Sequence, residues 1–230
     1  MEKITSLKNE KIKTYSKLLQ KKYRDQNNMF IVEGYHLVNE AKKTNLIIEI
    51  LTSDKNIKGT QVTPEIIKKI SEAKTPQPVI AICKKPKLKK VGQRVLVLNK
   101  VQDPGNVGTL IRSAKAFGWD TVLVQGADIY SPKVIRSSQG AIFHINTIQI
   151  QDCEKMILGK NTVGAVLDPD AKSYKDYDGP KNNLWLILGN EGKGIESKII
   201  KKLKHKIYIP ISFESLNVAS AGAILLNEYK

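Results

Sequence analysis

The sequence contains few cysteines and few histidines. Its two cysteines, Cys83 and Cys153, lie far apart, so we expect two reduced core thiols rather than a disulfide or a metal-binding pair. Its three histidines, His36, His144 and His205, are isolated from one another, and no metal-ligand spacing is built on them. The sequence therefore predicts a protein that binds no metal.

Long apolar runs are also missing. No segment approaches the length of a membrane span, and the first residues, Met1 to Thr5, lack the apolar core of a signal peptide. The hydrophobic fraction of 41% is ordinary for a globular protein. We therefore expect a cytoplasmic protein without a membrane partner, and its 230 residues allow one large domain or two small ones.

Acidic residues are outnumbered. The chain has 38 Lys and Arg against 22 Asp and Glu, for a formal net charge of +16. Residues 1–90 hold 20 of the basic and 9 of the acidic residues, so most of the excess lies there. A basic protein of this kind is expected to bind a polyanion, most simply nucleic acid. The alternative is a generally lysine-rich composition in which the charge only maintains solubility.

The first part of the chain has the pattern of a compact α/β unit. Apolar residues at spacings of three to five over 3–24 predict one or two amphipathic helices. The other predicted elements are strands over 29–32, 46–51 and 78–83, and helices over 34–43 and from Pro64, with Thr63 as N-cap. The lysine-rich stretch 85–92 is a predicted linker between a domain over 1–84 and a domain over 93–230, and the alternative is a long surface loop within one domain.

Strands and helices alternate after the linker. The predicted strands are 94–99, 121–125, 143–149, 162–167, 184–188 and 206–210, and the predicted helices are 107–117, 132–139, 152–158, 194–203 and 215–229. Alternation of this kind predicts an α/β fold with a mostly parallel sheet covered on both faces.

A first candidate site follows the buried strand that contains Val95 to Leu98. The segment from Asp103 presents an amide at Asn106 and a guanidinium at Arg112, and its proline and glycines predict a sharp turn between strand and helix. Open α/β sheets bind ligands at this edge, so the two groups favour an anionic substrate. The alternatives are a turn or helix N-cap role for Asn106 and a surface ion pair for Arg112.

A second segment, Gly189 to Gly194, directly follows the predicted strand 184–188. Its three glycines permit close approach of the backbone to a ligand, and Glu191 is its single carboxylate. Since Lys193 precedes a glycine, the segment is no Walker A loop, and its glycine order differs from the dinucleotide-binding fingerprint. The alternative is an ordinary turn.

A third segment follows the predicted strand 206–210. Ser215, Leu216 and Asn217 precede a run of small residues that permits tight packing against the predicted C-terminal helix. The alternatives are a plain N-cap role for Ser215 and an ordinary contact between helices.

In this order, the three segments resemble the three motifs of the SpoU/TrmH family of RNA ribose 2′-O-methyltransferases, of the SPOUT superfamily. The matching stretches are 106–112, 188–194, and 209–210 with 215–218, while 131–141 resembles a further family segment. The resemblance extends over 94–229. Residues 1–90 resemble, less sharply, the RNA substrate-binding domain of many members.

The resemblance implies a C-terminal sheet threaded into a deep trefoil knot, a homodimer, and S-adenosylmethionine as cofactor. The cofactor-binding positions that it implies are Leu188, Gly189, Gly194, Ile209 and Leu216. The catalytic positions that it implies are Asn106, Arg112, Glu191, Ser215 and Asn217. The stretch 211–214 is about two residues shorter than usual in the family and lacks its glycine, which affects the expected wall of the cofactor pocket.

The function implied by the resemblance is methylation of a ribose 2′-hydroxyl in RNA, and we expect rRNA in preference to tRNA. An arginine is a poor general base because its pKa exceeds ~12, so Arg112 is expected to hold phosphate and stabilise a developing oxyanion. Two alternatives remain: a catalytically silent RNA-binding or ribosome-assembly protein of the same fold, and tRNA as the substrate. A methyltransferase that acts on protein or a small molecule fits poorly with the net charge of +11 on residues 1–90.

Overall fold

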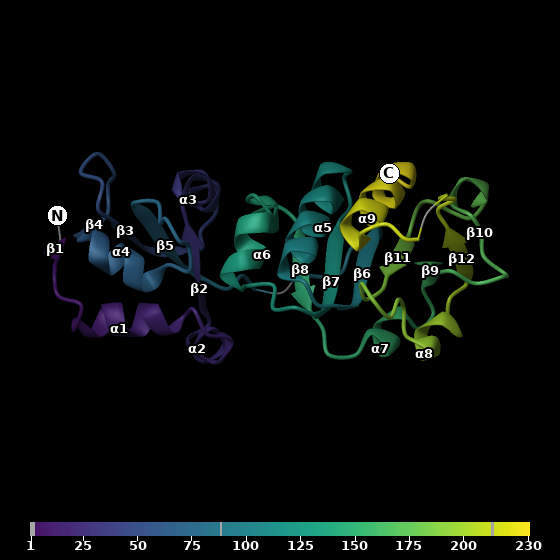
Figure 1. Ribbon diagram of the computed structural model, residues 1–230, viewed down its shortest axis with the longest axis horizontal. Coiled ribbons are helices and arrows are strands. Elements are labelled where there is room, and N and C mark those ends of the chain that lie inside the picture. Colours follow the sequence, from purple (N-terminus) through teal and green to yellow (C-terminus); the bar gives the residue numbers. More distant parts are fainter. Residues whose placement is uncertain (1–2, 88, 213) are drawn as a thin grey trace. The chain divides into compact units, whose positions relative to one another are not determined.

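The computed structural model describes residues 3–87, 89–212 and 214–230, so Leu88 of the predicted linker and Phe213 of the predicted cofactor loop lie outside the described residues. The chain forms two compact units (Figure 1). The first contains the residues up to Lys87 together with Tyr130–Phe143, and the second contains the remainder. The segment Tyr130–Phe143 thus packs with the N-terminal residues, although both of its neighbours in the chain belong to the second unit.

The first unit contains a five-stranded mixed sheet in the order β1-β4-β3-β5-β2. Its strands are β1 (Lys3–Ile4), β2 (Met29–Glu33), β3 (Ile47–Thr52), β4 (Thr60–Val62) and β5 (Val79–Lys84). Its helices are α1 (Glu10–Lys17), α2 (Lys21–Asn27), α3 (Tyr35–Lys42), α4 (Pro64–Ile70) and α6 (Pro132–Ser137). β4 pairs in parallel with β1 and β3, whereas β5 pairs antiparallel with β2 and β3.

The alternation of side chains along β2 separates two apolar layers in this unit. Ile31 faces α1 and α4, where it joins Ile12 and Ile66 in a buried cluster. Phe30 points to the opposite face, and its ring lies 4.9 Å from that of Tyr130. In Figure 1, α1 and α4 lie on one side of the sheet and α3 on the other. The second layer therefore requires residues from the segment Tyr130–Phe143.

The second unit contains a seven-stranded sheet in the order β10-β12-β9-β11-β6-β7-β8, and each strand pair in it is parallel. Its strands are β6 (Val95–Val101), β7 (Thr121–Gly126), β8 (Asn146–Gln149), β9 (Asn161–Ala165), β10 (Lys172–Ser173), β11 (Leu184–Leu188) and β12 (His205–Tyr208). The predicted α/β fold with a mostly parallel sheet is confirmed.

Helices cover both faces of this sheet, as the alternation predicts. They are α5 (Pro104–Ala116), α7 (Cys153–Ile157), α8 (Ser197–Ile200) and α9 (Val218–Glu228). Val95, Val97 and Ile187 pack in one buried cluster with residues of α7 and α8. Helices α5 and α9 pack together on the opposite face, where Gly222 of α9 lies against Leu188 (Figure 1).

Several predicted boundaries are wrong for identifiable physical reasons. The predicted helical stretch 3–24 begins with a strand, and its helices start at Glu10, behind the N-cap Asn9. The strand predicted over 143–149 starts at Asn146, because a 3₁₀ turn occupies Ala141–Phe143. The helix predicted over 194–203 is only Ser197–Ile200. The strands β1, β4 and β10 are two or three residues long and carry no periodicity that a sequence could reveal.

Neither unit carries a helix, among its described residues, that combines the length and apolarity needed to cross a bilayer. Within the same residues, no three His, Cys, Asp or Glu side chains are grouped so that they could hold a metal ion. Cys83 and Cys153 are both free and buried, and burial raises the pKa of each thiol to about 12.

Candidate active site

Three side chains from the three candidate segments form one hydrogen-bonded chain. Asn106 Nδ2 donates to Glu191 Oε1 at 3.0 Å, and Asn217 Nδ2 donates to Asn106 Oδ1 at 3.1 Å. These bonds join residues 85 and 111 positions apart in the sequence. The structure therefore brings together three of the five predicted catalytic residues, beyond the carboxyl ends of the neighbouring strands β6 and β11.

Glu191 is held in the ionised state by its surroundings. Partial burial opposes the charge, but hydrogen bonds from Asn106 and from the backbone amides of Asp103 and Gln102 outweigh it and keep the pKa of Glu191 below its ordinary value. An ionised carboxylate only accepts hydrogen bonds, so it fixes which way the Asn106 amide points. Glu191 is therefore a carboxylate at neutral pH and accepts the hydrogen bond from Asn106.

Helix α5 begins one turn earlier than the sequence predicts. Asp103 is the N-cap, its side chain accepts from the Asn106 amide at 3.0 Å, and Pro104 occupies the first helical turn. An Asp-Pro pair is a strong helix start because the carboxylate satisfies a free amide and proline needs no donor. Gly108 therefore lies inside α5, and the predicted sharp turn at Pro104 and Gly108 is wrong. The capping alternative for Asn106 is excluded.

Asn217 joins the site to the last helix. Its Oδ1 accepts from the backbone amides of Ala219 at 2.8 Å and Ser220 at 3.3 Å, which makes it the N-cap of α9. The prediction that the helix starts at Ser215 is wrong, since Ser215 lies in the exposed loop before the cap. The side chain of Asn217 thus uses its oxygen to start α9 and its nitrogen to hold Asn106.

Arg112 stands apart from this chain of hydrogen bonds. It lies six residues after Asn106 on the same helix, which is about 120° around the axis at ~100° per residue. Its side chain is exposed and has no hydrogen bond or ion pair with any described residue. The surface ion pair considered for Arg112 is therefore absent from the described part of the chain.

A pocket of about 470 Å³ opens beside Glu191. Its lining includes all five predicted cofactor-binding positions, namely Leu188, Gly189, Gly194, Ile209 and Leu216. Glu191 and Ser215 also line it. Residues predicted from two separate segments of the chain therefore surround one cavity.

The pocket wall exposes large apolar side chains to solvent. Leu167 is 84% exposed, and Tyr208, Ile211 and Leu216 are 37–42% exposed. Apolar groups gathered on a concave surface mark a place where a ligand with a flat or apolar part can bind. Sequence reasoning missed Leu167 and Tyr208 because nothing in their local pattern separates them from ordinary strand-end residues.

Glycines shape the backbone around this pocket. Asn190 and Gly194 exchange two backbone hydrogen bonds of 2.9 Å, which close a tight loop. A Cβ on Gly189 would lie 2.2 Å from the Gly194 carbonyl carbon and the Ile195 nitrogen, so only glycine fits there. A Cβ on Gly194, which has a φ of +66°, would meet nothing within 4 Å. The loop therefore has no room for a side chain at Gly189, whereas the space beside Gly194 is open.

Two supporting residues also escaped sequence reasoning. Asn190 Nδ2 donates to the Lys100 carbonyl at 2.9 Å and ties the glycine loop to the end of β6. Lys100 has a φ of +58° beside an irregularity in the pairing of β6 with β7. The position of Asn190 directly before Glu191 was a usable signal, whereas nothing in the sequence marks the bulge at Lys100.

Comparison with known proteins shows the family of the chain. Residues 93–227 match the SpoU rRNA Methylase family, and residues 9–81 match the MRM3-like substrate binding domain. The chain belongs to the SpoU rRNA methylase family, because the match covers more than half of its length and one relative is 36% identical over nearly all of it. The resemblance drawn from the sequence is confirmed.

That relative is the 23S rRNA (guanosine(2553)-2′-O)-methyltransferase RlmP of Bacillus subtilis, with 98% of each chain covered. A TrmH-family RNA methyltransferase structure from Porphyromonas gingivalis has a TM-score of 0.85 at 32% identity, with 98% of both chains covered. An AdoMet-bound rRNA methyltransferase from Sinorhizobium meliloti has a TM-score of 0.86 at 27% identity, with 99% of this chain and 97% of that one covered. Each of these three proteins is similar to this chain over both of its units.

Proposed function

We propose that this protein transfers a methyl group to a ribose 2′-hydroxyl of ribosomal RNA. It is an enzyme of the SpoU class and uses S-adenosylmethionine. The observation that carries the proposal is the hydrogen-bonded chain Glu191–Asn106–Asn217, because it joins all three family segments beside one pocket. A silent RNA-binding protein has no chemical need for this arrangement.

The pocket suits the cofactor on the chemistry of its lining. Leu216, Ile211 and Tyr208 offer apolar surface for a nucleoside, and the Gly189–Gly194 loop lets backbone groups approach it closely. When bound, S-adenosylmethionine supplies the methyl group. The residues Leu188, Gly189, Gly194, Ile209 and Leu216 hold it in this proposal.

Arg112 binds the RNA in this proposal. Its guanidinium has no partner among the described residues and is permanently charged, so it is available to grip the phosphate next to the target ribose and to stabilise the oxyanion that develops there. Asn106 and Asn217 then hold polar groups of the site in fixed directions. Ser215, exposed on the pocket wall, completes the catalytic set.

We propose 23S rRNA as the substrate, with the guanosine named for the Bacillus subtilis relative as the first position to test. Support comes from the identity of 36% over both units and from the positive charge of residues 1–90. We further propose that residues 1–84 bind the RNA and that residues 93–230 carry out catalysis after a linker at 85–92. Cytoplasmic location is part of the same proposal, supported by the two free buried thiols.

The experiment measures cofactor binding and methyl transfer separately. Calorimetry should show that wild type and Arg112→Ala bind S-adenosylmethionine equally well, while transfer to unmodified 23S rRNA falls by about 100-fold or more in the variant. Arg112→Lys tests whether charge alone suffices. Unchanged turnover in Arg112→Ala contradicts the role of Arg112, and failure of wild type to bind the cofactor at millimolar concentration favours the silent RNA-binding protein.

We also propose the trefoil knot and the homodimer. The knot is supported by the path of the chain around β12. Strand β12 pairs with β9, and the chain then returns, so that the next helix, α9, packs on α5 and on Leu188 of β11. The homodimer is supported by Arg112, which lies outside the pocket of its own chain, and by Ile224, a 38% exposed side chain on α9. A partner chain against α5 and α9 would cover both.

A further inference from the structure

A second hollow lies within the first unit. It has a volume of about 310 Å³ and is lined by residues of β2, α3 and the stretch 73–77, together with residues of α6. Two contacts on either side of α6 join its segment to the rest of this unit: the Phe30 and Tyr130 rings lie 4.9 Å apart, and His36 Nε2 donates to the Gln139 carbonyl at 3.2 Å. The segment 131–141, which the proposed site does not use, thus forms one wall of a built cavity.

Arg136 is the charged group on that wall. The chain has only four arginines against 34 lysines. Arg24 donates to the Leu18 and Leu19 carbonyls, and Arg94 donates to the Gly118 carbonyl. The guanidinium of Arg136, like that of Arg112, has no hydrogen bond or ion pair with a described residue, and Arg136 lines the hollow. A free arginine in a lysine-rich chain indicates a need for the planar fork that binds phosphate through two hydrogen bonds.

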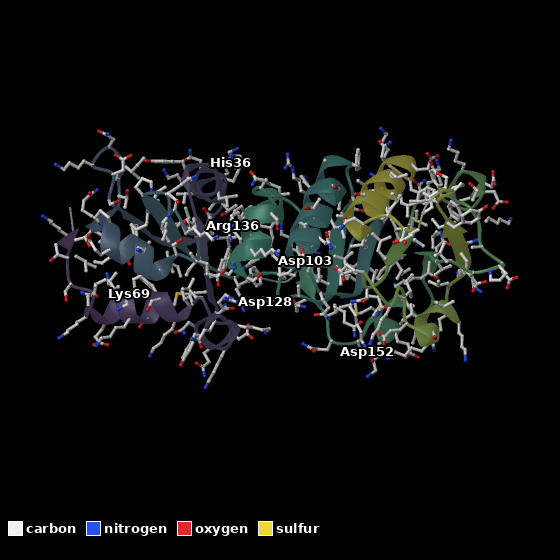
Figure 2. All side chains as sticks on the ribbon, in the orientation of Figure 1. His36, Lys69, Asp103, Asp128, Arg136 and Asp152 are labelled. Carbon is white, nitrogen blue, oxygen red and sulfur yellow. The ribbon has the colours of Figure 1, made fainter. Side chains whose placement is uncertain are left out.

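The other residues that line the hollow include apolar groups and a carboxylate, which a site for a simple anion would not contain. Apolar surface comes from Ile135 and Pro132, and hydrogen-bonding groups come from Gln77 and from Glu33, whose carboxylate also accepts from Ser71 Oγ at 2.7 Å. A bare phosphate would be repelled by Glu33. A nucleotide instead presents a phosphate, an apolar ring face and ring donors and acceptors together, and the volume suits one such unit. Figure 2 shows Arg136 and His36, which both line this hollow.

We propose that this hollow binds one nucleotide of the RNA substrate, distinct from the methylated one, with Arg136 on its phosphate. The proposal rests on the proposed function for the identity of the RNA. Glu33 and Gln77 then contact the base, while Ile135 and Pro132 pack on its ring. Residues from the segment 130–143 thereby complete a nucleotide site in the first unit.

The first test measures binding of the full-length protein to an unmodified 23S rRNA transcript over a range of salt. Arg136→Ala should weaken binding about tenfold and make the plot of log K against log salt shallower by about 0.7–0.9, as expected for one lost phosphate contact. Arg136→Lys should keep the salt slope and recover only part of the affinity. Lys58→Ala removes one exposed charge outside the hollow and should change affinity less than twofold. Equal losses in Arg136→Ala and Lys58→Ala overturn the proposal.

The second test uses the wild-type chain, so that misfolding of a variant cannot decide the outcome. Transcripts that contain 4-thiouridine are cross-linked to the protein, and cross-linked peptides within 31–37 or 131–139 are expected. Absence of such peptides from a protein that binds and methylates the transcript contradicts the site and leaves the proposed function standing. Cross-links at these peptides together with no methyl transfer by wild type support the nucleotide site and contradict the proposed function.

Discussion

At the scale of single residues, the site depends on which groups are charged and which are only polar. Glu191 is surrounded by donors and stays ionised, and the donors fix Asn106 and through it Asn217. We propose that Glu191, Asn106 and Asn217 serve to hold the amides of the site in fixed directions, because preorganised dipoles of this kind stabilise charge as it develops.

Glu191 gives a prediction with a definite sign. Because the folded-state pKa of Glu191 lies below its ordinary value of 4.5, its charged form stabilises the fold above that pH, and this contribution disappears as the pH falls through the folded-state pKa. The difference in melting temperature between wild type and Glu191→Gln should therefore be constant from pH 8 to 6 and shrink below pH 5. A difference that grows on acidification would show that Glu191 is neutral in the folded protein.

At the scale of elements, the loop between β11 and α8 is sensitive to added side-chain volume at one position and tolerant of it at another. Glycine is required at position 189, where a Cβ would collide with backbone atoms, but at position 192 a Cβ would come no closer than 3.9 Å to Asn190. Gly189→Ala should lower the free energy of unfolding by about 1–3 kcal/mol and abolish cofactor binding.

The matched control is Gly192→Ala, which lies in the same loop and on the same pocket wall. It should leave both the urea unfolding curve and the calorimetric affinity for S-adenosylmethionine close to those of wild type. If both alanine variants bind the cofactor normally, the pocket does not depend on the lack of room at Gly189, and the cofactor site is placed wrongly.

Sequence patterns predicted the elements of the second unit well because buried parallel strands such as 184–188 are uninterrupted apolar runs. The start of α5 was predicted too late because Pro104, Gly105 and Gly108 favour a turn when they are considered alone. The side chain of Asp103 caps the helix at this point and so stabilises a helical start instead. The meeting of Asn106, Glu191 and Asn217 followed only from the resemblance. No local pattern contains the crossings that bring them together, and none reveals that the segment 130–143 packs with the N-terminal residues.

At the scale of the whole molecule, we predict a dimer. Light scattering coupled to gel filtration should give twice the chain mass of 25.7 kDa. Ile224→Glu on α9 should shift the protein toward the monomer, because it places a charge in the proposed interface. Leu158→Glu, which changes another exposed apolar residue just after α7, should not. A monomeric wild type would contradict the proposed dimer, in which a partner chain lies against Arg112.

The charge of the molecule agrees with the proposed function. A net charge of +16 suits a large RNA, and the two candidate RNA-binding arginines lie one in each unit: Arg112 on α5 and Arg136 on α6. Deletion of residues 1–84 would be a poor test of the first unit. It would remove Phe30 and so expose Tyr130 and Phe143, which pack on the Phe30 ring. Point variants in the full chain avoid this problem.

The most direct test of the central claim is a map of 2′-O-methyl groups in 23S rRNA from cells that lack this protein. One ribose should lose its methyl group, and the wild-type gene should restore it whereas the Arg112→Ala gene should not. An unchanged methylation map, or full restoration by Arg112→Ala, would contradict the assignment of this chain as an rRNA 2′-O-methyltransferase that acts through Arg112.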